Sequence, residues 1–251
     1  LIVNAHRINN GLYPILNKGS DFYFIREQNP SNIVETILQL CKDRLPTYYG
    51  VDPIKDIQVL TPMKKGDVGL NSLNKHLQDI LNPKAPYKKE KQIGEDIFRV
   101  GDKVMQIKNN YSIEWEMVEE GVLTERGEGV FNGDLGMVMD IDEDDRILKV
   151  LFDEGKEVEY SFDQLDELKL SYAITIHKSQ GSEFPVVVMP VYWGPPMLLT
   201  RNLLYTAITR AKKLVVLVGD EKYIRKMIDN NHIDKRYSSL DYKIRNALLM
   251  L

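Results

Sequence analysis

The sequence has little cysteine and no long apolar run. Cys41 is the only cysteine in 251 residues, which excludes a disulfide framework and a zinc site built on cysteines. No stretch reaches the roughly 18 apolar residues of a membrane span, and the N-terminus lacks the charged-then-apolar pattern of a secretory signal. We therefore expect a soluble protein in the reducing cytoplasm, with no membrane partner. Because the sequence begins at Leu1 rather than Met, we expect it to be a piece of a longer chain.

Several catalytic signatures are also absent. The loop G-x-x-x-x-G-K-[S/T], whose amides hold nucleotide phosphates, does not occur, and the only Gly-Lys pair, Gly155-Lys156, is followed by glutamate. The four histidines are scattered, with no pair four residues apart, so we expect no metal centre. The G-x-S-x-G pattern of serine hydrolases is missing too. The chain alone therefore lacks a complete set of parts for a recognised reaction.

Charge is present in quantity, and it is unevenly distributed. The formal net charge is only −4, yet residues 95–169 hold 22 acidic and 8 basic residues, while the rest of the chain holds 15 acidic and 25 basic ones. Such an asymmetry indicates two modules, of which the basic one is the candidate to face nucleic acid or a nucleotide. Solvated surfaces that merely differ in charge are the alternative.

Outside the acidic window, apolar strands alternate with helical stripes. Strands are expected at residues 22–25, 57–61, 170–176, 186–189 and 214–218. Helices are expected from Pro30 with Ser31 as N-cap, over 70–81, over 198–211, after a cap at Asp220, and after a cap at Ser239. This alternation, together with 43% apolar residues, favours an α/β layer around a parallel sheet.

The acidic window shows no long helical stripe. Its strand candidates are short and closely spaced, at residues 104–107, 136–139, 148–152 and 158–160. The Glu-Gly-Lys turn at 154–156 can close a hairpin. We therefore expect a small antiparallel β-barrel, residues 98–168, inserted into an α/β domain made of residues 1–97 and 169–251.

The polar segment T-I-H-K-S-Q-G-S-E-F, residues 175–184, lies between two buried strands. Open α/β sheets bind ligands outside the carboxyl ends of their strands, where we expect this segment. Thr175 and His177 alternate and project to one side, Gly181 permits close approach of the backbone, and Glu183 can hold a ribose hydroxyl or a metal-bound water. A plain connector with solvated side chains is the alternative.

Two further segments combine cations with an ordered backbone. Residues 203–213, L-L-Y-T-A-I-T-R-A-K-K, predict a helix with Arg210 at the edge of its apolar arc. A guanidinium held in a fixed direction suits stabilisation of a transferring phosphoryl group, although an isolated arginine more often extends into solvent. Residues 60–66, L-T-P-M-K-K-G, form a basic turn past a strand end, which is either a phosphate-contacting loop or an ordinary surface turn.

Taken in order, these segments resemble the second motor domain of superfamily 1 DNA helicases, most closely the RecD-like (RecD/TraA) group. Residues 175–184 are similar to the family's motif V, and residues 203–213 to its motif VI. Residues 59–77 resemble the segment after motif IV, and residues 4–9 resemble the helix that follows the motif IV arginine. The expected barrel resembles the Src-homology-3-like insertion of this group. The resemblance implies a RecA-like domain, related to the P-loop NTPases, with an inserted β-barrel.

This resemblance also implies roles for single residues. Arg210 would be the arginine finger that reaches the γ-phosphate of ATP, and Gly181 and Glu183 would line the ribose and phosphate side of the cleft. Phosphates of single-stranded DNA would be contacted by a second set of residues, Thr61, Lys64, Thr175 and His177. The barrel would form a wall of the DNA channel, a role that its acidic balance fits poorly.

The implied activity is that of an ATP-dependent DNA helicase, stepping 5′→3′ in DNA repair or recombination. ATP with Mg²⁺ would be bound mainly by an upstream motor domain that carries Walker A, Walker B and the motif IV arginine. The expected partners are that upstream domain, single-stranded DNA and, for a parent within a nuclease complex, its other subunits. The chain alone is expected neither to hydrolyse ATP nor to unwind DNA.

Two other interpretations remain open. One is a non-catalytic nucleic-acid adaptor that kept the motor fold and lost the motor. The other is a protein-interaction scaffold, in which Trp115 and Tyr111 form an aromatic groove on the barrel.

Overall fold

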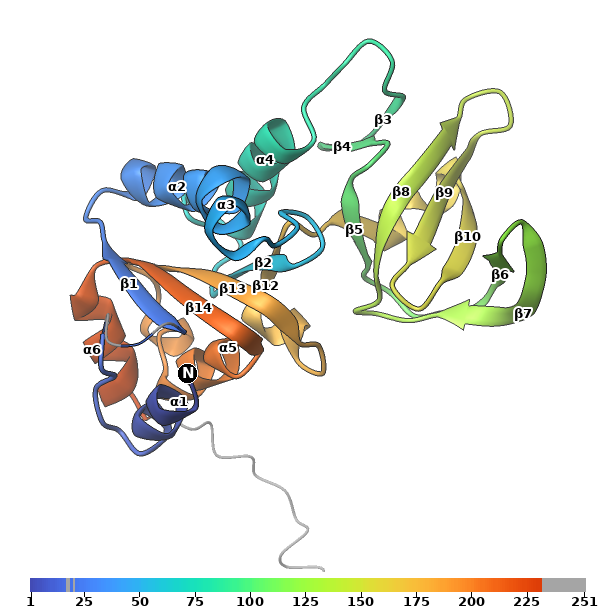
Figure 1. The fold of residues 1–251 in the computed structure, drawn as a ribbon. Coiled ribbons are helices and arrows are strands. Elements are labelled where there is room, and N and C mark those ends of the chain that lie inside the picture. Colours follow the sequence, from blue (N-terminus) through green and yellow to red (C-terminus); the bar gives the residue numbers. More distant parts are fainter. Residues whose placement is uncertain (17–18, 20, 232–251) are drawn as a thin grey trace, which may run out of the picture.

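The computed structural model describes residues 1–16, 19 and 21–231, and they form two units (Figure 1). The first unit is built on a five-stranded sheet in the order β1-β14-β13-β2-β12, in which every pair of neighbours is parallel. Its strands are β1 (Phe22–Arg26), β2 (Ile57–Thr61), β12 (Ala173–Thr175), β13 (Phe184–Val191) and β14 (Ala211–Gly219). The expected RecA-like parallel sheet is confirmed.

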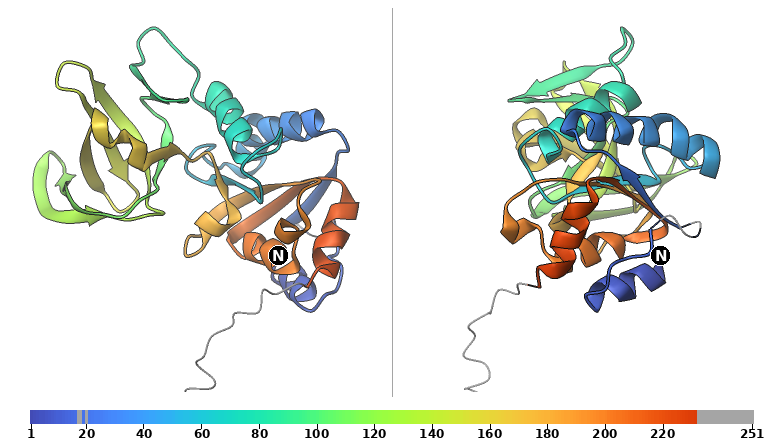
Figure 2. Two further views of the ribbon diagram at one scale, coloured as in Figure 1. Left: turned by 180° about the vertical axis from the view of Figure 1, so that it is seen from behind. Right: turned by 90° about the vertical axis from the view of Figure 1, so that its left-hand side faces the viewer.

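Helices cover both faces of this sheet, as Figures 1 and 2 show. One face carries α1 (Ile2–Asn9), α5 (Arg201–Ile208) and α6 (Glu221–Asp229). Their apolar residues, among them Ile8 and Leu204, form one apolar cluster with the strands. The other carries α2 (Pro30–Gln39), the π-helical turn η1 (Leu40–Arg44), α3 (Leu45–Tyr49) and α4 (Leu70–Leu81), around Ile37 and Leu73. Because both faces are covered, β13 and β14 are apolar almost throughout.

Two of the three expected helix caps can be compared with the structure. The N-cap of α2 is Asn29, whose Oδ1 accepts a hydrogen bond from the Ser31 amide at 2.9 Å, so the assignment of Ser31 as the cap is wrong. Asp220 caps α6 as expected, accepting from the Lys222 amide at 3.0 Å. The helix expected after Ser239 lies outside the described residues. None of the helices in the described part of the chain is long and apolar enough to cross a membrane.

The second unit is a seven-stranded antiparallel sheet in the order β11-β5-β8-β9-β10-β6-β7. Its strands are β5 (Lys103–Gln106), β6 (Asn110–Glu119), β7 (Val122–Val130), β8 (Leu135–Asp142), β9 (Ile147–Phe152), β10 (Lys156–Ser161) and β11 (Leu168–Leu170), with η2 (Phe162–Glu167) before the last. A separate apolar cluster, which includes Leu148 and Tyr160, forms its core. The expected hairpin at 154–156 joins β9 to β10.

Three features of this region differ from the expectation. The long β6–β7 hairpin occupies residues for which no strand was expected. A two-stranded sheet, β3 (Glu90–Ile93) with β4 (Asp96–Arg99), precedes β5. The strand expected over 170–176 is divided between the two sheets, because β11 pairs with β5 whereas β12 pairs with β2.

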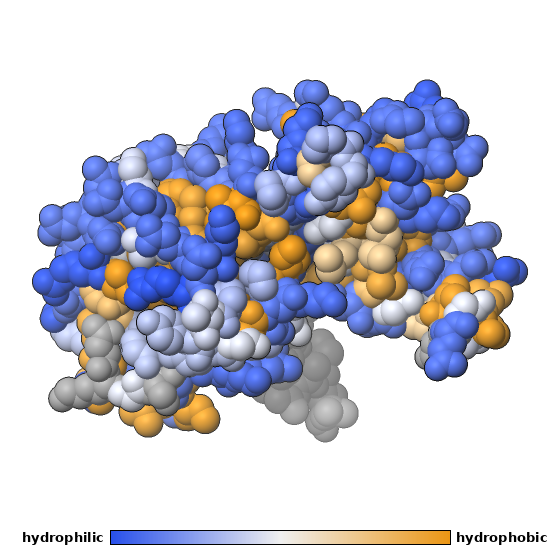
Figure 3. Space-filling view, turned by 45° about the horizontal axis from the view of Figure 1, so that its top comes forward, coloured by the Kyte–Doolittle hydropathy of each residue, from blue (hydrophilic) through white to orange (hydrophobic). Residues whose placement is uncertain are grey.

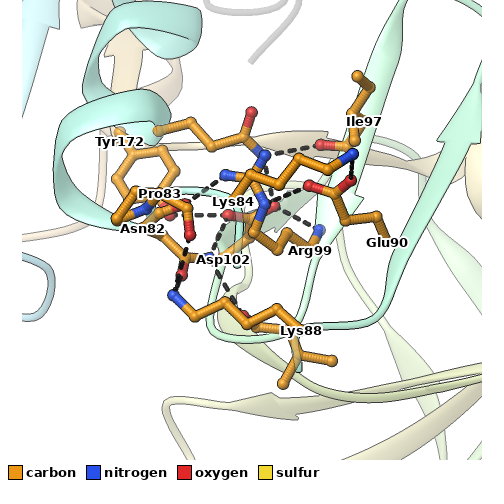
Figure 4. Close-up of polar contacts among 11 residues, drawn as sticks. Asn82, Pro83, Lys84, Lys88, Glu90, Ile97, Arg99, Asp102 and Tyr172 are labelled. Atoms are coloured by element: carbon orange, nitrogen blue, oxygen red, sulfur yellow. Dashed lines mark hydrogen bonds and ion pairs between the residues drawn. The ribbon is translucent and has the colours of Figure 1, made fainter. Parts of the chain in front are cut away.

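A buried carboxylate, Asp102, joins the two units (Figure 4). It accepts hydrogen bonds from Gln78 Nε2 at 2.6 Å and Asn82 Nδ2 at 2.7 Å, both at the end of α4. The Tyr172 hydroxyl donates at 2.9 Å and the Arg99 amide at 2.7 Å. Burial raises the pKa of Asp102, and these donors oppose that shift. The last turn of α4 is thereby fixed to the start of β5.

Lys103, the next residue, is also buried at the junction. Among the described residues no partner accepts a hydrogen bond from its Nζ, which lies 5.9 Å from the centre of the Phe184 ring. Burial lowers the pKa of Lys103 to about 8, while Asp153 acts in the opposite direction. On the face drawn in Figure 3, hydrophilic side chains predominate, and hydrophobic ones are visible across the middle of the view and at its lower edges.

Candidate functional site

Motif V, residues 175–184, runs from the end of the parallel sheet where the strands finish, here called the carboxyl edge, to the end where they begin, here called the amino edge. It leaves the carboxyl end of β12, passes through the short helix η3 (Ile176–Ser179) and enters the amino end of β13. Parallel strands require such a return crossing. The expectation that the whole segment lies outside the carboxyl ends is therefore wrong for Gly181 and Glu183, which lie at the amino edge beside Phe184.

Arg210 lies at this amino edge too, in a turn and not on a helix. The predicted helix over 198–211 is shorter, because α5 ends at Ile208 and β14 begins at Ala211. The carbonyl of Arg210 already accepts a hydrogen bond from the Phe184 amide at 2.8 Å, so pairing with β13 ends the helix.

The Arg210 side chain is oriented by motif V. Its Nη1 donates to the Ser182 carbonyl at 3.1 Å, and its Nη2 donates to Thr209 Oγ1 at 3.4 Å. The guanidinium is part-buried, and its Nε has no partner among the described residues. Such a group retains N–H donors beyond the two that the chain uses.

Gly181 and Glu183 complete the amino-edge cluster, which we define as Gly181, Ser182, Glu183 and Arg210. Gly181 has φ of +92°, a left-handed conformation that favours glycine. Glu183 is exposed, and its carboxylate forms an ion pair with Lys212 at 3.4 Å. The structure therefore brings together the three residues that the resemblance assigns to the nucleotide.

At the opposite end of the sheet, where the strands finish, lies a groove of about 1270 Å³, which we call the carboxyl-edge groove. Its walls come from the loop after β2, from motif V, from the antiparallel unit and from the segment after β13. It is lined by residues 62–66, Leu70, Asn71, Met105, Ile107, Lys169, Leu170, 173–175, His177, Lys178, Trp193, Pro195 and Leu198. Lys64, Thr175 and His177, three of the four predicted nucleic-acid contacts, thus lie along one groove.

The charge of the carboxyl-edge groove has one sign. Four lysines line it, Lys64, Lys65, Lys169 and Lys178, and no aspartate or glutamate is among the lining residues that the structure describes. Burial lowers the pKa of Lys178, and the nearby charge of Lys64 lowers it further. The acidic window contributes only Met105, Ile107 and Lys169 to the lining, so its negative charge lies elsewhere.

Thr61, the fourth predicted contact, is not part of the groove lining. It pairs in register with Thr175 but is fully buried. Its Oγ1 donates to the Val68 carbonyl at 3.0 Å and accepts from the Met63 amide at 3.3 Å. The hydroxyl is therefore used to hold the loop between β2 and α4, which leaves it unavailable to a phosphate.

Helix α4 fixes the elements around the groove. At its start, the Leu70 amide donates a hydrogen bond to the Met63 carbonyl of the preceding loop at 2.9 Å. In its middle, the Asn74 side chain donates to the Ala173 carbonyl at 2.9 Å and accepts from the Ala173 amide at 2.8 Å. Its end holds Asp102. One helix thereby positions the basic loop, the strand that carries Thr175 and the antiparallel unit.

Sequence reasoning missed the groove residues outside the motifs, above all Trp193, Met105 and Ile107. Trp193 lies two positions after the end of the buried strand β13, and an exposed aromatic residue near the carboxyl end of a buried strand is a signal that could have found it. Met105 and Ile107 could not be placed, because their position depends on how the two units pack. Within the described residues, no group of three His, Cys, Asp or Glu could hold a metal ion.

Comparison with known proteins identifies the family. The model of the ATP-dependent RecD-like DNA helicase SH3 domain matches residues 73–152, and the model of the UvrD-like helicase C-terminal domain matches residues 170–218. The chain belongs to the RecD-like group of superfamily 1 helicases. The first match covers most of the antiparallel unit of this RecD-like chain, and the second covers motifs V and VI.

Two curated relatives illustrate the similarity. The ATP-dependent RecD2 DNA helicase of Deinococcus radiodurans is 40% identical over 156 residues, 62% of this chain and 19% of that protein. The RecBCD enzyme subunit RecD of Mycolicibacterium smegmatis is 28% identical over 193 residues, 76% of this chain and 29% of that protein. The RecD-like chain spans less than a third of the length of these relatives.

Among solved structures, Pif1 helicase from Bacteroides in complex with ADP-AlF3 and single-stranded DNA aligns with TM-score 0.48 and 20% identity, over 98% of this chain and 53% of that chain.

Proposed function

We propose that this chain is the second motor domain of an ATP-dependent DNA helicase that steps 5′→3′. The observation that carries the proposal is the path of motif V, which joins the amino-edge cluster around Arg210 to the carboxyl-edge groove. The proposed nucleotide site and the proposed DNA site are thus two ends of one segment. The chain would work with an upstream domain that carries the phosphate-binding loop.

At the amino edge, Arg210 would supply positive charge to a phosphate held by the upstream domain. Its bond to the Ser182 carbonyl fixes its direction, and a preorganised guanidinium stabilises the charge that develops during phosphoryl transfer. Glu183 is exposed and would accept a hydrogen bond from the ribose. ATP with Mg²⁺, bound mainly by the upstream domain, would supply the reacting phosphoryl group.

At the carboxyl edge, single-stranded DNA would lie in the groove. Lys64 and Lys178 would contact its phosphates, and Thr175 and His177 would add polar contacts from motif V. Contacts of this kind set register and salt dependence without sequence preference. Closure of the two motor domains on ATP would move motif V as one piece, so that the nucleotide state alters the hold on DNA.

The nucleic-acid part of the proposal is tested by binding of this chain to a fluorescent oligo(dT) over a series of salt concentrations. Replacement of both Lys64 and Lys178 by alanine should weaken binding and flatten the slope of log K against log [salt] by about 1.4. The matched control is Lys226→Ala, an exposed lysine on α6 outside the groove, which should leave the slope unchanged. Equal slopes for both variants would place the DNA elsewhere.

The motor part is tested on the chain joined to its upstream domain, by strand-stimulated ATP turnover. Turnover that depends on oligo(dT) supports the motor. Salt-dependent binding of oligo(dT) without any turnover would replace the motor by the nucleic-acid adaptor that the sequence leaves open.

A further inference from the structure

Trp193 exposes its indole at the carboxyl-edge groove. The residue is 63% exposed, lies two positions after the end of β13 and is among the groove-lining residues with Met63, Pro195 and Leu198. In the part of the chain that the structure describes, no aromatic ring or cation packs against it. Its place in a groove that other apolar side chains also line makes this indole part of a larger exposed apolar surface, which marks an interaction site.

The backbone on both sides of Trp193 is fixed. The ring of Tyr192 packs against that of Tyr223 on α6, with centroids 5.9 Å apart. On the other side, Gly194 is buried so tightly that a Cβ there would lie 2.7 Å from Met63 Sδ. Pro195 then restricts the chain further. The backbone of Trp193 is therefore held beside the loop of residues 62–66 by its neighbours, while most of its side chain stays exposed.

The chemistry of the groove selects a polyanion with flat apolar groups. Apolar side chains lie in its lining, from Met63, Met105, Ile107, Leu170 and Leu198. Lysines accompany them, and no acidic side chain is among the described lining residues. A protein segment would need no such one-signed charge, whereas single-stranded nucleic acid has both phosphates for the lysines and base faces for the apolar surface.

We propose that Trp193 is a stacking platform for one nucleobase of a single strand whose phosphates contact Lys64 and Lys178. The inference rests on the proposed function and adds a residue outside motifs V and VI. Stacking on an indole tolerates every base, because each base has a π-face. The platform therefore adds affinity for nucleobases without adding sequence preference.

The two tryptophans of the chain allow a direct test. Trp115→Phe leaves Trp193 as the only indole, and its emission is followed during titration with oligo(dT) and with an abasic oligonucleotide of equal length. Oligo(dT) should quench the emission, whereas the abasic strand should bind through its phosphates without quenching. In a separate variant, Trp193→Ala should bind oligo(dT) about tenfold more weakly and the abasic strand as tightly as the unchanged chain. Trp193→Phe should restore most of the loss.

The outcomes separate this inference from the function on which it rests. Oligo(dT) binding that depends on Lys64 and Lys178, with unchanged Trp193 emission and no loss in Trp193→Ala, would overturn the stacking platform and leave the proposed function intact. If neither the oligo(dT) nor the abasic strand binds, the DNA groove and the platform are both overturned. Far-ultraviolet circular dichroism verifies that each variant keeps its fold.

Discussion

Nη1 of Arg210 donates a hydrogen bond to the carbonyl oxygen of Ser182 at 3.1 Å. The two residues are 28 positions apart, one in motif VI and one in motif V. The direction of the guanidinium is therefore decided by the turn that also carries Gly181 and Glu183, and the planar fork of arginine still has donors for a ligand.

For Arg210→Lys, we expect the charge to be kept but the fork geometry to be lost. A lysine ammonium cannot reproduce the bond to Ser182 and also present a planar pair of donors. ATP turnover by the chain joined to its upstream domain should fall by about 10³-fold or more, with oligo(dT) affinity unchanged. Lys213→Ala, an exposed neighbour on β14, is the control. A loss smaller than tenfold would remove Arg210 from phosphoryl transfer.

Replacement of Thr61 by valine removes one hydroxyl from the loop after β2. The Val68 carbonyl and the Met63 amide then lose a partner inside the protein, so the free energy of unfolding should fall by about 1–3 kcal/mol in urea titrations. Thr61→Ser keeps the hydroxyl and should lose less than half of that. Oligo(dT) affinity of the folded Thr61→Val protein should stay within twofold; a large loss of affinity without loss of stability would return Thr61 to the DNA contacts.

Asp102→Ala removes the acceptor of four buried hydrogen bonds at the junction of the two units. Donors from α4, from Tyr172 and from the Arg99 amide are left unpaired, and the free energy of unfolding should fall by about 3 kcal/mol. Asp96→Ala, which breaks a surface ion pair with Lys169, should cost less than about 1 kcal/mol. Equal effects of the two variants would show that the hydrogen bonds of Asp102 do not hold the two units together.

Lys103 predicts a distinctive dependence of stability on pH. Its pKa is lowered by burial to about 8, against 10.5 for an ordinary lysine. Between these values the unfolded chain holds a proton that the folded chain has released, so the contribution of Lys103 to stability rises as pH rises from 8 towards 10.5.

Lys103→Met removes this titration. The difference in free energy of unfolding, wild type minus variant, should increase by on the order of 3 kcal/mol across that pH range. Urea unfolding at pH 7, 8, 9 and 10 measures the difference, with the exposed Lys42→Met as the control. Parallel curves for wild type and Lys103→Met would contradict a buried, unpaired ammonium at the junction.

The sequence predicted the parallel sheet well, because strands buried on both faces appear as short continuous apolar runs, as in residues 186–189. It missed the β6–β7 hairpin because most of β7 is exposed and polar. That hairpin is stabilised by contacts across its strands. Trp115 lies so close to Gly127 that a Cβ there would be 2.4 Å from its ring, and Glu116 pairs with Arg126 at 3.0 Å.

The candidate site was predictable where it depends on motifs, and unpredictable where it depends on distant pairing. Arg210, Gly181 and Glu183 stay predictions as nucleotide contacts, although the structure places them together. The end of α5 before Arg210 was not predictable, because it depends on a hydrogen bond between Arg210 and the distant Phe184 that local periodicity cannot reveal. Thr61 has the residue type of a phosphate contact, yet its hydroxyl is used by its own loop. Trp193 lies in the groove beside Met63, a residue from the loop after a different strand, and the close packing of Gly194 on Met63 could not be predicted from the sequence.

The antiparallel unit is strongly acidic, yet it turns none of its carboxylates into the carboxyl-edge groove within the described residues. A nucleic acid that approaches this unit from outside is repelled by like charge, and one that approaches along the lysines is attracted. Under the proposed function, this unit would therefore repel nucleic acid from its outer surface and leave the lysine-lined groove as the favourable approach. While one nucleic-acid strand lies in the groove, a second nucleic-acid strand, or the far end of the same one, would be repelled by the acidic outer surface of the antiparallel unit.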